Sequence, residues 1–212
     1  MKESIQKIKE GVIEGRHKEI ESLVREICKT GISPETVIQE GLIAAMDTVG
    51  RRFSAGEIFV PEMMVSAMTM KLGLNIVKPL VTGQAGESRG VVLMGTVKGD
   101  LHDIGKNIVV MMLEGAGFRV IDMGVDIDVE KVVAKVAEIR PQVLGLSALL
   151  TTTMPEMKLV IEEIRARGLR ERVKVMVGGA PVDAAFAEKI GADGYGKDAV
   201  QAVAMARSFI GF

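Results

Sequence analysis

The feature that most constrains the fold is a series of short apolar segments in the second half of the 212-residue chain. Their residues are almost continuously apolar, which is typical of strands buried on both faces of a parallel sheet. We predict strands at 91–97, 119–124, 143–148, 173–179 and 192–195. Helices are expected near 103–116, 128–139, 154–167, 182–190 and 198–210. This alternation predicts an α/β fold with a doubly wound, five-stranded parallel sheet, where ligands bind beyond the carboxyl ends of the strands.

The first half of the chain has helical spacing throughout residues 1–81. Ser33-Pro34-Glu35 is a helix start, with a hydroxyl cap and a first-turn proline, and this helix is expected to run to about Val49. A break follows at 50–59, and a fourth helix runs from Pro61 to about Val81. Four helices with short links predict a bundle. We therefore expect a helical cap domain at 1–88 and an α/β domain at 89–212, joined by the glycine-containing linker TGQAGESR at 82–89.

Composition narrows the range of functions. The 27 basic and 28 acidic residues give a net charge of −1, which offers no electrostatic reason to expect nucleic acid or an anionic membrane as a partner. No apolar run approaches the roughly 18 residues of a membrane span, and the start of the chain lacks a signal-peptide pattern. Cys28 is the one cysteine, so no internal disulfide forms. We expect a soluble cytoplasmic protein.

The loop after the first expected strand carries the candidate site. It contains Asp100, His102 and Gly105 in the pattern Asp-x-His-x-x-Gly. Imidazole is a common metal ligand, and a ligating histidine often donates its other ring N–H to a carboxylate. Asp100 could supply that carboxylate. The local triplet alone leaves open that His102 is an ordinary loop histidine and Asp100 a helix cap. Structural zinc is disfavoured, because it needs about four Cys or His ligands.

Two further patterns stand at the expected carboxyl ends of later strands. They are Ser147-Ala148-Leu149 and the pair Gly178-Gly179. Each alone is compatible with a buried hydroxyl or an ordinary glycine turn. The set Asp-x-His-x-x-Gly, Ser-x-Leu and Gly-Gly resembles the cobalamin-binding domain of methionine synthase. With its helical first half, the whole chain is similar to corrinoid proteins of the methylamine, methanol and aryl-methyl-ether methyltransferases.

The resemblance implies a cobalamin or related corrinoid bound base-off, with its own base displaced and His102 as the lower cobalt ligand. Asp100 would accept the ring N–H, and Thr153 would support Asp100 where the family often has serine. The Gly178-Gly179 pair would line the slot for the cofactor's tail. The full implied set of cofactor-binding residues in the second half is Gly99, Asp100, Leu101, His102, Asp103, Gly105, Ser147, Leu149, Thr151, Thr153, Gly178, Gly179 and Ala199.

The resemblance also implies that the helical half caps the upper face of the corrin. Phe53 and Val60 match apolar cap positions, and Gln39 matches a polar position near the cofactor's edge. A dry apolar cap would shield reduced cobalt from water. The methionines of the fourth helix, Met63, Met64, Met68 and Met70, are interpreted as adaptable core instead of cofactor surface.

The implied function is that of a methyl carrier. A substrate-specific methyltransferase would place a methyl group on cobalt, and a second methyltransferase would pass it to a thiol or to tetrahydrofolate. A reductive activation protein is a further expected partner. The chain would be a subunit of such a system more than an independent enzyme. The alternatives are a cobalamin-dependent regulator or light sensor, the cobalamin domain of a carbon-skeleton mutase, and a flavodoxin-like module without a corrinoid.

Overall fold

The computed structural model describes residues 2–80 and 89–211. The chain divides into two compact units, Met1–Ser88 with Glu114–Gly117, and Arg89–Leu113 with Phe118–Phe212. The expected linker at 82–89 lies, except for Arg89, outside the described residues. The two-domain boundary therefore stays a prediction. No helix among the described residues is both long enough and apolar enough to cross a membrane.

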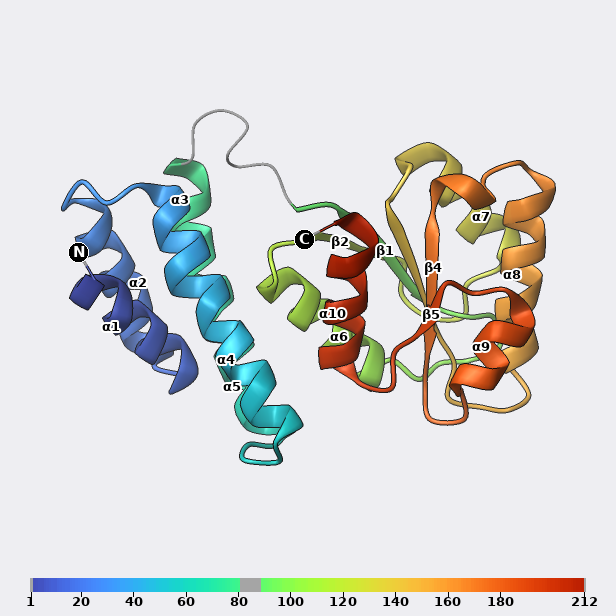
Figure 1. The fold of residues 1–212 in the computed structure, drawn as a ribbon, viewed down its shortest axis with the longest axis horizontal. Helices are drawn as coiled ribbons and strands as arrows, with labels where there is room; N and C mark the ends of the chain where they lie inside the picture. Colours follow the sequence, from blue (N-terminus) through green and yellow to red (C-terminus); the bar gives the residue numbers. More distant parts are fainter. Residues whose placement is uncertain (1, 81–88, 212) are drawn as a thin grey trace. The chain divides into compact units, whose positions relative to one another are not determined.

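Figure 1 shows the helical unit, whose helices bury apolar side chains such as Ile8, Ile20 and Leu42. Ser33 caps the third helical segment, because its Oγ accepts a hydrogen bond from the Thr36 N–H at 3.2 Å. Met63 and Met70 are almost fully buried, which confirms their interpretation as core, whereas Met68 is 57% exposed. The elements are α1 (Lys2–Ile13), α2 (His17–Cys28), α3 (Pro34–Thr36), the π-helix η1 (Val37–Ile43), α4 (Ala44–Ser54), α5 (Val60–Val77) and the 3-10 helix η2 (Lys78–Leu80).

The third helical segment is longer than the sequence analysis predicted. The break was placed at 50–59, but α4 continues through Gly50 to Ser54. Val49 and Gly50 are buried, and Arg51 and Arg52 are good helix formers, so packing outweighs the single glycine. The helix ends at Ser54 with Ala55 as its cap, and Gly56 follows with a φ of 73°, in the left-handed region that glycine tolerates.

The second unit has the predicted doubly wound α/β fold. The strands are all parallel, in the order β2-β1-β3-β4-β5. Helices α6 and α10 cover one face of the sheet, and α7, α8 and α9 cover the other (Figure 1). The elements are β1 (Val91–Thr96), α6 (Ile104–Gly115), β2 (Arg119–Asp122), α7 (Val129–Ile139), β3 (Val143–Ser147), α8 (Met154–Ala166), η4 (Arg170–Arg172), β4 (Lys174–Gly178), α9 (Ala184–Ile190), β5 (Gly194–Tyr195) and α10 (Ala199–Ile210).

The register of the central strands fixes where the loops emerge. Leu93, Leu144 and Val175 lie side by side and are fully buried, and each such side chain contributes roughly 1.5–3 kcal/mol by leaving water. At the carboxyl edge, Thr96 pairs with Ser147 and Ser147 with Gly178. From β1 the chain adds β2 on one side of the sheet and then β3, β4 and β5 on the other, so the strand order switches between β1 and β3, where such folds bind ligands. The loops after β1 and β3 therefore meet at the expected position of a site.

Candidate functional site

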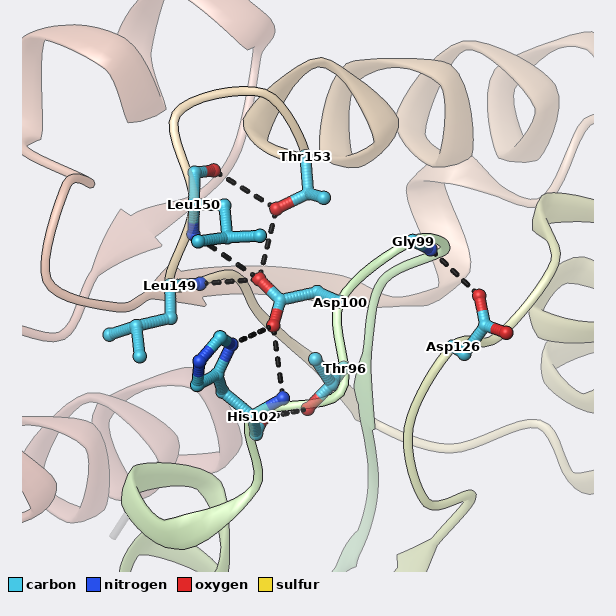
Figure 2. Close-up of polar contacts among 8 residues, drawn as sticks. All are labelled: Thr96, Gly99, Asp100, His102, Asp126, Leu149, Leu150 and Thr153. Carbon is cyan, nitrogen blue, oxygen red and sulfur yellow. Dashed lines mark hydrogen bonds and ion pairs between the residues drawn. The ribbon is translucent and has the colours of Figure 1, made fainter.

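The centre of the site is the carboxylate of Asp100, on the loop after β1. It is fully buried and accepts hydrogen bonds from two loops (Figure 2). Its Oδ1 lies 3.0 Å from the His102 backbone nitrogen and 2.7 Å from His102 Nδ1. Its Oδ2 accepts from the backbone nitrogens of Leu149 at 2.7 Å and Leu150 at 3.3 Å. The Thr153 hydroxyl, 2.9 Å from Oδ2, completes a set of donors that ties the β1 loop to the β3 loop.

These hydrogen bonds keep Asp100 ionised. Burial on its own raises the pKa of a carboxyl, because it disfavours the charged form. In Asp100 the backbone N–H groups of His102 and Leu149, together with the side chains of His102 and Thr153, outweigh burial and hold the pKa well below its usual range. An ionised carboxylate only accepts hydrogen bonds. The His102 Nδ1 atom must therefore carry the proton that it shares with Asp100.

This contact defines the chemistry available to His102. With the proton on Nδ1, the neutral ring carries its lone pair on Nε2. The His102 side chain is 51% exposed, whereas Asp100 behind it is fully buried. A fixed tautomer with a carboxylate behind it is the usual arrangement of a histidine that ligates a metal. The structure thus brings together the predicted pair Asp100 and His102, and also the predicted third member, Thr153.

Exposed apolar side chains lie on the same two loops and at the first residue of α6. Leu101 is 71% exposed and Ile104 is 77% exposed, one on each side of His102 in the sequence. Leu149 and Leu150 on the β3 loop are 42% and 40% exposed. Large apolar side chains gathered at one site mark a ligand or partner surface more often than ordinary solvent-facing loops. A flat, largely apolar ligand with a central metal would cover such a surface.

The glycines predicted to line the site are placed in close backbone contacts. Gly179 has a φ of 132°, and a Cβ there would come within 1.8 Å of the Ala148 carbonyl oxygen. A Cβ at Gly178 would lie 2.9 Å from the carbonyl oxygen of Gly196. Both positions therefore require glycine for the backbone packing alone. Their predicted contact with the tail of a cofactor stays a prediction.

The other predicted residues fall into three groups. Asp103, Gly105 and Thr151 are exposed on the loops and helix start around His102, while Ser147 ends β3 and is half-buried. Ala199 is buried at the first position of α10, after the capping residue Asp198. The remaining three belong to the helical unit, where Phe53 is on α4, Val60 begins α5 and Gln39 is on the π-helix. Their position over a cofactor stays a prediction.

Several residues of the site were not predicted from sequence. Leu150 was not predicted, and its backbone nitrogen donates to Asp100 together with that of the predicted Leu149. Thr96 is fully buried, and its hydroxyl donates to the His102 carbonyl oxygen at 3.0 Å. The Lys106 side chain is buried in the first turn of α6 and pairs with Asp122 at the end of β2. The sequence did contain a signal for each of these residues. Thr96 is a polar residue at the end of an apolar strand, and Lys106 is a cation in the first turn of a helix, where cations are disfavoured.

The protein ligands available at the site fit a metal ion that is already held by a cofactor supplying most of its ligands. Within the described ranges 2–80 and 89–211, no group of three or more His, Cys, Asp or Glu side chains could hold a metal ion. One imidazole with an ionised carboxylate behind it supplies a single axial ligand. The exposed apolar side chains suit a macrocycle that supplies the rest. The residues present therefore fit a corrinoid.

Comparisons with known proteins agree with this geometry. A B12 binding domain model matches residues 90–204, and a second B12 binding domain model matches residues 4–78. The dimethylamine corrinoid protein of Methanosarcina barkeri is 42% identical over 209 residues, which are 98% of each chain. The trimethylamine corrinoid protein of the same organism is 40% identical over 208 residues, covering 97% of this chain and 96% of that protein.

Solved structures give the same result. The methanol:cobalamin methyltransferase complex of Methanosarcina barkeri matches with a TM-score of 0.88 at 32% identity, over 98% of this chain and 80% of that one. A cobalamin-binding protein from Desulfitobacterium hafniense matches with a TM-score of 0.83 at 30% identity, over 98% of both chains. Fold, site and matches together define a B12-binding protein with a helical N-terminal part. The chain belongs to the corrinoid protein family that includes the dimethylamine and trimethylamine corrinoid proteins.

Proposed function

We propose that this chain is a methyl-carrying subunit of a methyltransferase system, with the corrinoid bound base-off and His102 as the lower cobalt ligand. The observation that carries the proposal is the exposed His102 imidazole, whose Nδ1 is held at 2.7 Å by the buried carboxylate of Asp100. When bound, the corrinoid supplies a cobalt centre able to accept and release a methyl group. The protein supplies position, proton placement and protection from water.

His102 and Asp100 act as one unit in this proposal. Asp100 keeps the proton on Nδ1 and raises the basicity of Nε2, which is the atom that would meet cobalt. The Thr153 hydroxyl lies 2.9 Å from both Asp100 Oδ2 and the Leu150 carbonyl oxygen, so it can donate to either. When the Thr153 hydroxyl turns to Leu150, Asp100 loses one donor and binds the Nδ1 proton of His102 more strongly. The Thr153 hydroxyl could therefore adjust the basicity of His102 as cobalt binds to the ring or leaves it.

The remaining loop residues would hold the cofactor itself. The apolar side chains of Leu101 and Leu149 would lie against the corrin, and Ser147 and Thr151 would offer hydroxyls to its edge. The displaced tail would enter beside Gly178 and Gly179, near the start of α10 at Ala199. Phe53 and Val60 of the helical unit would exclude water from the opposite face, and Gln39 would offer a polar group near the edge of the cofactor.

The proposed partners follow from the carrier role. A substrate-specific methyltransferase would deliver the methyl group, a second one would transfer it to a thiol or tetrahydrofolate, and a reductive activation protein would restore the cobalt. One structural relative forms part of a methanol:cobalamin methyltransferase complex, and two sequence relatives are named for methylamines. These relationships favour the carrier over a cobalamin-dependent regulator.

The test is reconstitution of the purified chain with hydroxocobalamin. The electron paramagnetic resonance spectrum of the cobalt(II) form shows splitting from an axial nitrogen. Isotopic labelling of histidine changes this splitting only if the nitrogen belongs to the protein. We expect the change in the wild type and in the control His17→Ala, whose ring contacts Thr69 in the helical unit. We expect no labelled splitting in His102→Ala. A His102→Ala spectrum like that of the wild type would contradict the ligand assignment.

A further inference from the structure

Asp126, on the loop between β2 and α7, has an unusual backbone conformation. Its φ is 53°, in the left-handed region that residues other than glycine seldom adopt. Aspartate is among the side chains that tolerate this region, because its short polar group can bond to nearby backbone. Such conformations persist where the surroundings hold them, and they cluster at functional sites. The contacts of Asp126 show what holds it.

Asp126 forms hydrogen bonds with the backbone of Gly99 and Asp100. Its Oδ1 accepts a hydrogen bond from the Gly99 backbone nitrogen at 2.7 Å (Figure 2). Its own backbone nitrogen donates to the Asp100 carbonyl oxygen at 3.0 Å. Gly99 also has a positive φ, of 79°, so the turn that delivers Asp100 is itself an uncommon one. Both ends of the Gly99–Asp100 pair are thus bound to a single residue of a neighbouring loop.

The surrounding backbone reinforces the same junction. The Thr96 nitrogen donates to the Gly124 carbonyl oxygen at 3.0 Å, and the Ile127 nitrogen donates to the Thr96 carbonyl oxygen at 3.2 Å. Val97 and Ile127 form an isolated parallel bridge. The β2–α7 loop therefore runs beside the His102 loop as an extension of the sheet, and the Asp126 side chain binds the backbone of the His102 loop.

We propose that Asp126 is a positioning residue for the cobalt-binding unit. It sets the backbone of Gly99 and Asp100 so that one carboxylate reaches the His102 ring and the β3 loop at the same time. The proposal rests on the proposed function, because it assumes that the placed imidazole serves cobalt. Asp126 acts through Asp100 and touches neither the imidazole nor the expected place of the cofactor.

A neighbouring acid provides a matched control. Asp128, two residues further along, forms an ion pair with Lys98, and both side chains are more than half exposed. Asp128→Asn removes one negative charge at almost the same place without touching the Gly99 contact. An effect of charge alone on the site would therefore appear equally in Asp126 and Asp128 variants.

Three variants separate the contributions of Asp126. Asp126→Gly removes the carboxylate, and glycine adopts a φ of 53° without strain, so the fold is retained. Asp126→Asn keeps an acceptor oxygen and tolerates the same backbone, so it should restore the Gly99 contact. Asp128→Asn serves as the charge control. His102→Ala gives the reference for a lost ligand.

The first measurement needs no cofactor. Hydrogen exchange of the Gly99 amide, followed by nuclear magnetic resonance on the intact chain, reports the Asp126 contact directly. A hydrogen bond to a charged acceptor makes opening of the amide less frequent, so its loss in Asp126→Gly should speed exchange roughly tenfold or more. Asp128→Asn should stay within about twofold of the wild type. Asp126→Asn keeps a neutral acceptor, so its exchange should lie between that of the wild type and that of Asp126→Gly. Unchanged exchange in Asp126→Gly would overturn the contact.

The second measurement reports the consequence for the metal. After reconstitution with hydroxocobalamin, the fraction of cobalt(II) carrying labelled histidine nitrogen should fall severalfold in Asp126→Gly and recover in Asp126→Asn. A wild-type fraction in Asp126→Gly, with His102→Ala negative, would overturn the positioning role and leave the proposed function intact. Absence of labelled nitrogen in the wild type would overturn the ligand assignment instead, and Gly99 exchange would still decide whether Asp126 braces the loop.

Discussion

Two carboxylates lie at opposite ends of the same sheet, one fully buried and one partly buried, and they are held in different ways. Asp100, beyond the carboxyl end of β1, is held by backbone N–H groups, a hydroxyl and an imidazole. Asp193 lies at the amino end of β4 and β5. It accepts from the Val175 backbone nitrogen at 2.8 Å and pairs with Lys174 at 3.1 Å and Arg170 at 2.7 Å. One carboxylate has permanent cations around it, and the other does not.

The difference in partners indicates that Asp193 stabilises the fold, whereas Asp100 also acts on the His102 ring. Burial would raise the pKa of Asp193, but the Val175 backbone N–H, Lys174 and Arg170 hold the pKa below its usual value. Those cations already neutralise its charge. The donors around Asp100 other than the His102 ring are neutral, so its charge remains available to draw the Nδ1 proton of that ring. A cation beside Asp100 would weaken this pull, because the two would compensate each other.

The largest expected effect is that of Asp100→Asn. An amide can accept on one side only, and its NH2 group would face N–H or O–H donors that the carboxylate now satisfies. We expect a loss of about 3 kcal/mol in the free energy of unfolding of the cofactor-free chain, measured by urea denaturation. We also expect loss of the labelled-histidine signal of cobalt(II). Asp103→Asn, an exposed change on the same loop, is the control and should cost less than about 0.5 kcal/mol.

Asp193→Asn tests the other end of the sheet. We expect a loss of about 2 kcal/mol in the free energy of unfolding, because the ion pairs and one backbone acceptor weaken, while cobalt ligation by histidine is unchanged. Since the folded pKa is lowered, this stabilisation is complete above the unfolded pKa of about 3.9 and is lost as the pH falls toward the folded value. The difference between wild type and variant should therefore narrow below about pH 4. A constant difference from neutral to acid pH would contradict this assignment.

Thr153→Val makes a finer test of the Asp100 end. The valine has the same shape but no hydroxyl, so Asp100 loses one buried donor. Because this hydrogen bond has a charged acceptor, we expect its removal to lower the free energy of unfolding by about 1.5 kcal/mol. Ligation of cobalt by the imidazole should change less than in Asp100→Asn. Thr153→Ser keeps the hydroxyl and should lie close to the wild type. A loss in Thr153→Ser with none in Thr153→Val would show that the methyl group, and not the hydroxyl, is what matters.

The same comparison explains what the sequence could and could not predict. The strands and helices of the α/β unit follow from apolar runs and their spacing, which are local signals. Asp100 and His102 are two residues apart, so their contact was open to prediction from the loop itself, and Thr153 came from the family resemblance. The Asp193 ion pairs and the Gly99 contact of Asp126 join segments far apart in sequence. They depend on strand order and register, which no local pattern specifies. The continuation of α4 past Gly50 has the same cause, since burial of its neighbours decides it.

The smallest expected effect concerns Thr96, the last residue of β1, which pairs with Ser147 of β3. Its buried hydroxyl donates to the His102 carbonyl oxygen at 3.0 Å, so it holds the backbone of His102 and leaves the ring free. Thr96→Val keeps the side-chain volume but removes one hydrogen bond between neutral groups, so we expect a loss of about 1 kcal/mol in the free energy of unfolding. Thr96→Ser keeps the hydroxyl and should retain most of this stability. Because Asp100 would still hold the ring, the labelled-histidine signal should survive in Thr96→Val. Loss of that signal would mean that backbone placement, and not the Asp100 contact, limits ligation.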